Sequence, residues 1–76
     1  MNELEIFQAI YGLPLIIGMK VTIDPSNEYA SEWQGEFLVT GINWERHQKR
    51  MNVTISENWS DCGSDGWRTE DLRPVI

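Results

Sequence analysis

The chain is poor in cysteine, histidine and positive charge. Its 76 residues include one Cys, one His, and six Lys and Arg against twelve Asp and Glu, for a net charge of −6. The lone Cys62 cannot form an internal disulfide, which favours a reducing compartment, so we expect a cytoplasmic protein. A zinc site would need His47, Cys62 and distant carboxylates together, and no complete catalytic set is present. We therefore expect no metal, no cofactor and no enzymatic activity.

Long hydrophobic runs are also absent. The longest apolar stretch, residues 13–17, is interrupted by Pro14 and is too short to cross a membrane, so we expect no membrane partner. The chain opens with Asn2 and Glu3 and lacks a positively charged start, so we expect no secretory signal. With 41% hydrophobic residues, the composition predicts one globular domain over residues 1–76.

Residues 3–11 are predicted to form a short helix. Asn2 and Glu5 have the spacing of a capping pair, and Gly12 follows the last helical position. The apolar positions fall on one face: Leu4, Phe7, Ile10 and Tyr11. A helix this short is not stable alone, so this face must dock on the domain or on a second copy. One structural alternative is therefore a homodimer joined through Leu4, Phe7 and Tyr11.

After Gly18 the apolar period changes to two, which is typical of strands. Met19, Val21 and Ile23 alternate with polar residues in a first strand. Residues 35–44 and 51–56 predict a hairpin, but Gly41 interrupts the alternation of the first arm, so we expect a bulge there. Residues 67–68 predict a short fourth strand, residues 69–72 a helical turn capped by Thr69, and residues 74–76 a closing edge strand.

This order of elements resembles an SH3-like small barrel of the Tudor and KOW kind. The resemblance covers residues 18–76, about four fifths of the chain. It rests on Gly18-Met19-Lys20-Val21 at the entry and on Glu70-Asp71-Leu72-Arg73-Pro74-Val75 as the one-turn helix and closing strand. It implies a mainly β, five-stranded SH3-like barrel, preceded here by the additional helix at residues 3–11. Because this fold hosts unrelated functions, the layout alone does not fix an activity.

In such a meander, alternate loops emerge at the same end. Residues 24–34 and 57–66 are therefore expected to share one edge, which we call the acidic rim. Its carboxylates are Asp24, Glu28, Glu32, Glu57, Asp61 and Asp65, and its aromatic residues are Tyr29, Trp33 and Trp59, with Trp67 close behind. The turn at residues 45–50 is expected at the opposite end, with its cations Arg46, Lys49 and Arg50 around His47.

Aromatic faces beside carboxylates suit a cationic group, since ring quadrupoles attract it. We hypothesise a small acidic interaction module that binds a basic protein surface. The expected binding residues are Tyr29, Trp33, Trp59, Glu28, Glu32, Asp61 and Asp65. The resemblance to Tudor-like modules implies that rim aromatics could form a cage for methylated lysine or arginine. Trp44 and Trp67 are interpreted mainly as core-filling residues. Small acidic proteins of this kind are typical of phage and mobile elements.

Two other interpretations concern the charged turns. The net charge of −6 argues against general affinity for nucleic acid, but Arg46, Lys49 and Arg50 beside Trp44 could contact phosphates locally, as KOW-like barrels can. Asp61 and Asp65 resemble the opening of a calcium loop, yet Gly63 and Leu72 stand where ligands are needed. A flexible acidic turn explains that segment better.

Overall fold

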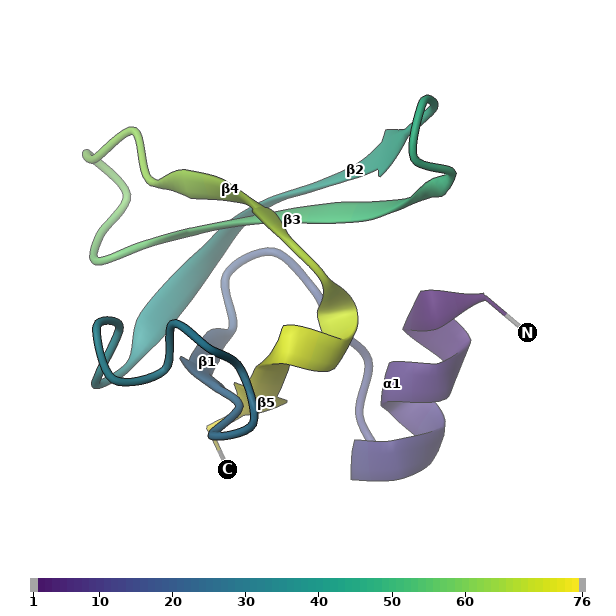
Figure 1. Ribbon diagram of the computed structural model, residues 1–76, viewed down its shortest axis with the longest axis horizontal. Helices are drawn as coiled ribbons and strands as arrows, with labels where there is room; N and C mark the ends of the chain where they lie inside the picture. The colour runs from purple at the N-terminus through teal and green to yellow at the C-terminus, as the bar shows by residue number, and fades with distance from the viewer. Residues whose placement is uncertain (1, 76) are drawn as a thin grey trace.

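A computed structural model describes residues 2–75 and consists of one short helix and a five-stranded antiparallel sheet (Figure 1). Its elements are α1 (Glu3–Tyr11), β1 (Lys20–Ile23), β2 (Phe37–Glu45), β3 (Arg50–Ser56), β4 (Ser64–Trp67), the 3-10 turn η1 (Thr69–Asp71) and β5 (Leu72–Pro74). The strand order is β4-β3-β2-β1-β5. Within residues 2–75, β4 and β5 are the outer strands and do not pair, so the sheet is not closed into a barrel. Met1 and Ile76, the ends of the expected domain, lie outside the described residues.

Local chemistry fixes both ends of α1. The side chain of Asn2 accepts a hydrogen bond from the Glu5 N–H (2.9 Å), which satisfies a free donor of the first turn. Gly12 adopts the left-handed conformation (φ 76°), and its N–H donates to the Gln8 carbonyl (2.8 Å). The predicted helix and its capping residues are therefore confirmed.

The apolar face of α1 packs on the protein's own core. Phe7 is 3% exposed, and Leu4 and Tyr11 lie against the same cluster of buried side chains. The face proposed for a homodimer therefore packs within the same chain. This packing stabilises α1, which is too short to be stable alone. The large hydrophobic residues of α1 that remain exposed are Ile6 and Ile10.

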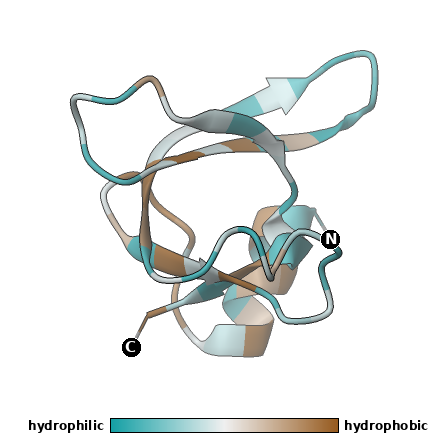
Figure 2. Cartoon of the chain, turned by 60° about the vertical axis from the view of Figure 1, so that its left-hand side comes forward, coloured by the Kyte–Doolittle hydropathy of each residue, from teal (hydrophilic) through white to brown (hydrophobic). Residues whose placement is uncertain are grey.

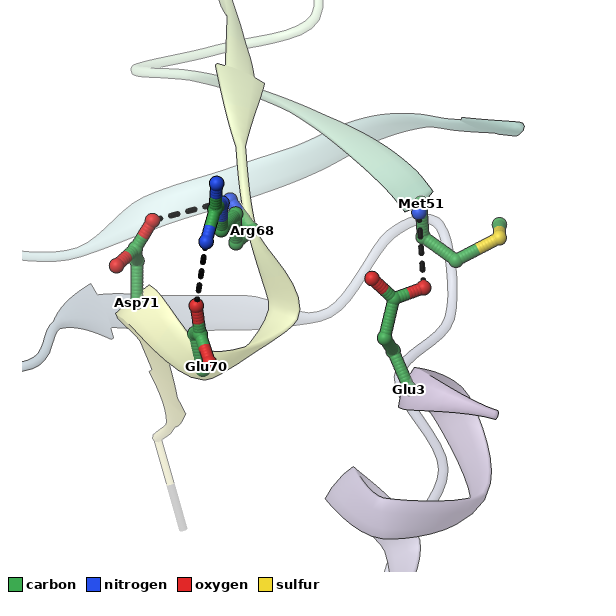
Figure 3. A network of polar contacts seen from close by, with 5 residues as sticks. All are labelled: Glu3, Met51, Arg68, Glu70 and Asp71. Carbon is green, nitrogen blue, oxygen red and sulfur yellow. Dashed lines mark hydrogen bonds and ion pairs between the residues drawn. The ribbon is translucent and has the colours of Figure 1, made fainter. Parts of the chain in front are cut away.

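A polar contact ties α1 to the sheet, and two others join η1 to Arg68, its N-terminal cap (Figure 3). A Glu3 carboxylate oxygen accepts a hydrogen bond from the Met51 N–H (2.8 Å) at the edge of β3. In η1, Asp71 accepts from the Arg68 N–H (3.1 Å), and Arg68 pairs with Glu70 (3.2 Å). The prediction that Thr69 caps this turn is wrong: Thr69 is the first residue of the turn and is buried, and Arg68 is the cap.

The long strand β2 bends at a bulge, as the sequence predicted. Its pairing with β3 shifts register between Val39 and Gly41, so that Ile42 returns to the face that holds Val39. A Cβ on Gly41 would lie 3.3 Å from the Thr54 hydroxyl, so glycine gives β3 room at the bend. The bulge lets one strand pair with β1 at its start and extend beyond β1 at its end (Figure 1).

The buried cluster lies between the two halves of this bent sheet and α1. Its members are Phe7, Leu15, Val21, Ile23, Phe37, Val39, Val53, Ile55, Trp67 and Leu72. The inward positions predicted for β1, β2 and β3 are included in it, apart from the half-buried Met19, Ile42 and Met51 and the exposed Trp44. Figure 2 shows hydrophilic residues concentrated on the turn between β2 and β3, which projects away from this core.

The last two strands begin earlier than expected. β4 covers Ser64–Trp67, because its start pairs with Ile55 across a second register shift. β5 covers Leu72–Pro74 and pairs with β1, whereas the predicted edge strand at residues 74–76 would have left Leu72 outside the sheet. Leu72 is fully buried, so hydrophobic burial sets this boundary.

Candidate binding site

Side-chain caps shape the loop between β1 and β2. Asp24 accepts hydrogen bonds from the N–H and hydroxyl of Ser26 (2.9 and 2.7 Å), and the Asn27 side chain accepts from the Tyr29 N–H (2.7 Å). The Trp33 N–H then donates to the Tyr29 carbonyl (3.1 Å) in a helix-like turn. This local structure returns the loop toward the sheet and places Trp33 over the core.

Trp33 is held by two aromatic neighbours. Its ring centroid lies 5.4 Å from that of Phe37 and 5.3 Å from that of Trp67, and the second pair meets edge to face. The Trp67 indole N–H donates to the Ser64 hydroxyl (3.3 Å), and only 7% of Trp67 is exposed. The rings are therefore fixed by packing before any ligand is bound.

An open hollow of about 270 Å³, which we call the aromatic hollow, lies between the loop before β2 and strand β4. Its walls include three aromatic side chains, Tyr29, Trp33 and Trp67. The remaining lining residues are Asn27, Ser64, Asp65, Gly66 and Asp71. The hollow is therefore built from β4, η1 and the first loop, which are distant in sequence.

A second hollow of about 240 Å³, the flanking hollow, shares Trp33 and Ser64 with the first. It extends along the loop between β3 and β4 and includes the acidic residues Glu57 and Asp61. The two predicted loops thus lie side by side, as the meander required. Trp33 stands between the two hollows.

The acidic residues of the rim differ in their surroundings. Asp65 lines the aromatic hollow, together with Asp71 of η1 from outside the rim, and Asp61 lines the flanking hollow. Glu28 and Glu32 are exposed on the first loop and belong to neither lining. They contribute to the surrounding negative field and not to the walls.

Asp24 has a structural role. Its carboxylate pairs with the Arg73 guanidinium (2.9 Å), which joins the end of β1 to β5. The hydrogen bonds from the Ser26 N–H and hydroxyl, followed by that from Arg73, lower the pKa of Asp24 to about 2. The negative charge of Asp24 is therefore already balanced by Ser26 and Arg73, and Asp24 does not count among the binding residues.

Trp59 does not join the other rim aromatics. It is 64% exposed and lines neither hollow; its ring lies near Gly18, 3.8 Å from where a Cβ would stand. Of the three aromatic residues expected on the rim, Tyr29 and Trp33 line the aromatic hollow and Trp59 does not; the third ring of the lining is Trp67. Trp67 was interpreted as core, and it is buried and lines the hollow at the same time.

The basic turn holds fewer free cations than its sequence suggests. Arg46, His47 and Lys49 are exposed, and Trp44 beside them is 56% exposed, so Trp44 does not fill the core as interpreted. Arg50 is half-buried and lines a separate hollow with Glu3, Arg68 and Glu70. Its Nε is enclosed and has no hydrogen-bond partner among residues 2–75. Arg46, Lys49 and Trp44 therefore remain as the exposed groups of the nucleic-acid alternative.

No family model, no curated protein and no solved structure matches this chain. Across residues 2–75, no three His, Cys, Asp or Glu side chains lie close enough together to hold a metal ion. None of the described helices has the length and apolar character that a membrane crossing requires.

Proposed function

We propose that this protein is a binding module and not an enzyme, and that the aromatic hollow receives a cationic side chain from a basic protein surface. The observation that carries this proposal is the convergence of three aromatic rings and two carboxylates, Asp65 and Asp71, on one hollow. Ring faces and carboxylates both attract a cation, and together they disfavour an anion.

The energetics favour a desolvated cation with an extended stem. A cation over an aromatic face is stabilised by about 0.5–2 kcal/mol, and more when water is excluded. Trp33 and Trp67 are immobilised by packing on each other, so the ligand does not have to order them. Tyr29 is 50% exposed and is the wall that can adjust to the ligand. Lysine, methylated lysine and arginine have the required charge and reach.

The acidic field around the hollow would accelerate encounter with a basic partner. Glu28, Glu32 and Asp61 lie on the same rim, outside the aromatic hollow, and the protein carries a net charge of −6. Exposed charges of this kind change the association rate and its salt dependence more than the final affinity. Charge reversal at these three positions should therefore slow association, whereas changes within the hollow should accelerate dissociation.

Matched peptides test this proposal. The peptides differ at one position, which holds lysine, trimethyllysine, arginine or the neutral acetyllysine, and the indole N–H signals of Trp33 and Trp67 report binding by NMR. We expect shifts with the three cationic peptides and none with acetyllysine. Tyr29→Ala should weaken binding about 5- to 10-fold, the effect of one lost ring contact.

Trp59→Ala is the matched control, because Trp59 is also an exposed loop tryptophan but lies outside the aromatic hollow. It should leave the affinity unchanged. Equal binding of acetyllysine, or equal losses in Tyr29→Ala and Trp59→Ala, would contradict the proposal.

We further propose kinship with SH3-like small barrels and action in the cytoplasm. The kinship is supported by the strand order β4-β3-β2-β1-β5 and by a 3-10 turn between the last two strands. The exposed, unpaired Cys62 is compatible with a reducing compartment. A phage or mobile-element origin stays a prediction from size and charge.

A local nucleic-acid contact is the second candidate. The exposed Trp44 beside Arg46 and Lys49 favours it, because an aromatic face and two cations could meet a base and adjacent phosphates. The double variant Arg46→Glu/Lys49→Glu should abolish binding of a fluorescent single-stranded oligonucleotide at low salt. Unchanged oligonucleotide binding in this variant would exclude the basic turn as the site.

A further inference from the structure

Strand β2 has an unpaired outer edge over its second half. β1 pairs with β2 only at Phe37 and Leu38, and the last backbone contacts between these segments involve Val39, which bonds to Gly18 and Met19. After the bulge, residues 41–45 pair with β3 on one side and with no described strand on the other. Figures 1 and 2 both show this end of the hairpin projecting beyond β1 and β5.

The hydrogen-bond alternation shows which groups face this edge. The Met51 N–H donates to Glu3 on the far side of β3, so Met51 and its partner Trp44 do not exchange hydrogen bonds with each other. Val53 lies two residues after Met51 and pairs with Trp67 of β4 on the same far side of β3. The backbone groups of Ile42, which is opposite Val53 in β2, are therefore also directed away from β3. The N–H and C=O groups of Ile42 and Trp44 therefore point to the open edge.

We propose that this edge pairs with the same edge of a second copy, antiparallel and around a two-fold axis at Asn43. In this register Ile42 of each copy lies opposite Trp44 of the other. Each such pair exchanges two backbone hydrogen bonds, so the two pairs join the sheets through four bonds. The two Asn43 residues face each other at the axis as a pair that does not exchange backbone bonds.

The side chains at this edge are self-complementary. Ile42 and Trp44 lie on the same face of β2, so the paired edges bring two isoleucines and two tryptophans together. Aromatic and β-branched residues directly opposite each other stabilise antiparallel strands. Ile42 is half-buried on its own core and Trp44 is 56% exposed, so Trp44 gains most from the pairing. On the other face, Asn43 meets Asn43, and Glu45 lies opposite Gly41.

The distribution of charge permits this approach despite the net charge of −6. The nearest charges are the exposed Arg46 and Lys49 on the turn and the half-buried Glu45 at the end of β2, and in this register none of these residues lies opposite the same residue of the second copy. The carboxylates of the aromatic hollow, Asp65 and Asp71, belong to β4 and η1 and not to the hairpin strands β2 and β3. Exposed edges in monomeric proteins usually carry a protective lysine or proline, and residues 40–44 contain neither.

A dimer of this kind would present two aromatic hollows outward. If the proposed function holds, one dimer could engage two cationic side chains of the same partner, and avidity would raise the affinity without a new contact. The pairing itself does not depend on that function, because it is measured on the protein alone.

Amide hydrogen exchange of the wild-type chain tests the pairing. Between about 20 µM and about 1 mM, a range suited to small transient interfaces, exchange at Ile42 and Trp44 should slow several-fold as concentration rises. The Asn43 amide bonds to β3 in each copy and should be protected at every concentration. Sedimentation over the same series should show a monomer–dimer equilibrium.

Trp44→Pro removes an outward donor without removing a bond to β3, and should abolish the dimer. Trp44→Ala keeps the donor but loses the ring, and should weaken the dimer less. Trp59→Ala changes an exposed tryptophan elsewhere and should not affect it. The proposal is overturned by a monomer at about 1 mM with unprotected Ile42 and Trp44 amides, or by a dimer that persists in Trp44→Pro and is lost in Ile10→Lys on α1.

Discussion

The two ends of the molecule carry opposite charges and hold their side chains in different ways. At the loop end, Tyr29, Trp33 and Trp67 come from separate segments, and packing on the core fixes the two tryptophans. At the hairpin end, Arg46 and Lys49 are close in sequence and exposed to solvent, with no ion pair among residues 2–75. A preorganised surface supports selective binding, whereas free cations on a turn support only a salt-sensitive contact.

The loop end should be the more sensitive to a single methyl group. A Cβ on Gly63 would lie 2.6 Å from the Ile55 carbonyl oxygen, and Gly63 has φ 76°. Gly63→Ala should therefore lower the free energy of unfolding by about 3 kcal/mol, from steric overlap and left-handed strain together. Urea denaturation measures the change.

Gly66→Ala is the matched control for that substitution. Gly66 also has a positive φ (86°) and lies at the same end of the molecule, but no atom lies within 4 Å of its Cβ position. It should cost only about 1 kcal/mol. Equal losses in both variants would show that backbone strain, and not contact with β3, determines the effect.

The hairpin end depends on one contact from α1. Glu3 accepts the Met51 N–H, so Glu3→Ala leaves that donor without its partner and should lower the free energy of unfolding by about 1–2 kcal/mol. Glu3→Gln retains an acceptor and should lose less. Thermal unfolding of the two variants compares them, and identical midpoints would mean that water replaces the carboxylate.

The pH dependence of stability tests the structural role of Asp24. The pKa of Asp24 falls from 3.8 to about 2 on folding, so its contribution to stability is complete above pH 3.8 and is lost as the pH falls toward 2. Wild type should therefore be more stable than Asp24→Asn at pH 6, and the difference should shrink through this window. Urea denaturation between pH 2 and pH 6 measures it. A difference that does not change with pH would contradict the assigned pairing with Ser26 and Arg73.

Local patterns predicted most of the fold. The Asn2 cap, the Gly12 end of the helix and the bulge at Gly41 each depend on a few adjacent residues, and all three are observed. The boundary of β5 was missed because the burial of Leu72 depends on tertiary contacts and not on its neighbours in sequence. The cap of η1 was missed because the Asp71 side chain bonds back to the Arg68 N–H, which leaves Thr69 inside the turn.

The candidate site was predicted only in part. Alternation of strands was sufficient to bring the two acidic loops together. It could not indicate that Trp59 turns toward Gly18, or that the buried Trp67 also lines the hollow, because both depend on packing between distant segments. The position of Trp67 directly after the acidic loop was the available signal. A tryptophan can fill a core with one part of its ring and line a ligand site with another.

The smallest effect is expected from the exposed cations of the hairpin end. Arg46→Gln and Lys49→Gln remove charges that form no ion pair among the described residues, so the free energy of unfolding should change by less than about 0.5 kcal/mol. Arg50→Gln should cost more, because its stem is half-buried beside Glu3 and Glu70. Chemical denaturation of the three variants ranks them. If Arg50→Gln matches the other two, the basic turn behaves as one solvated group, and the contrast between the two ends becomes sharper.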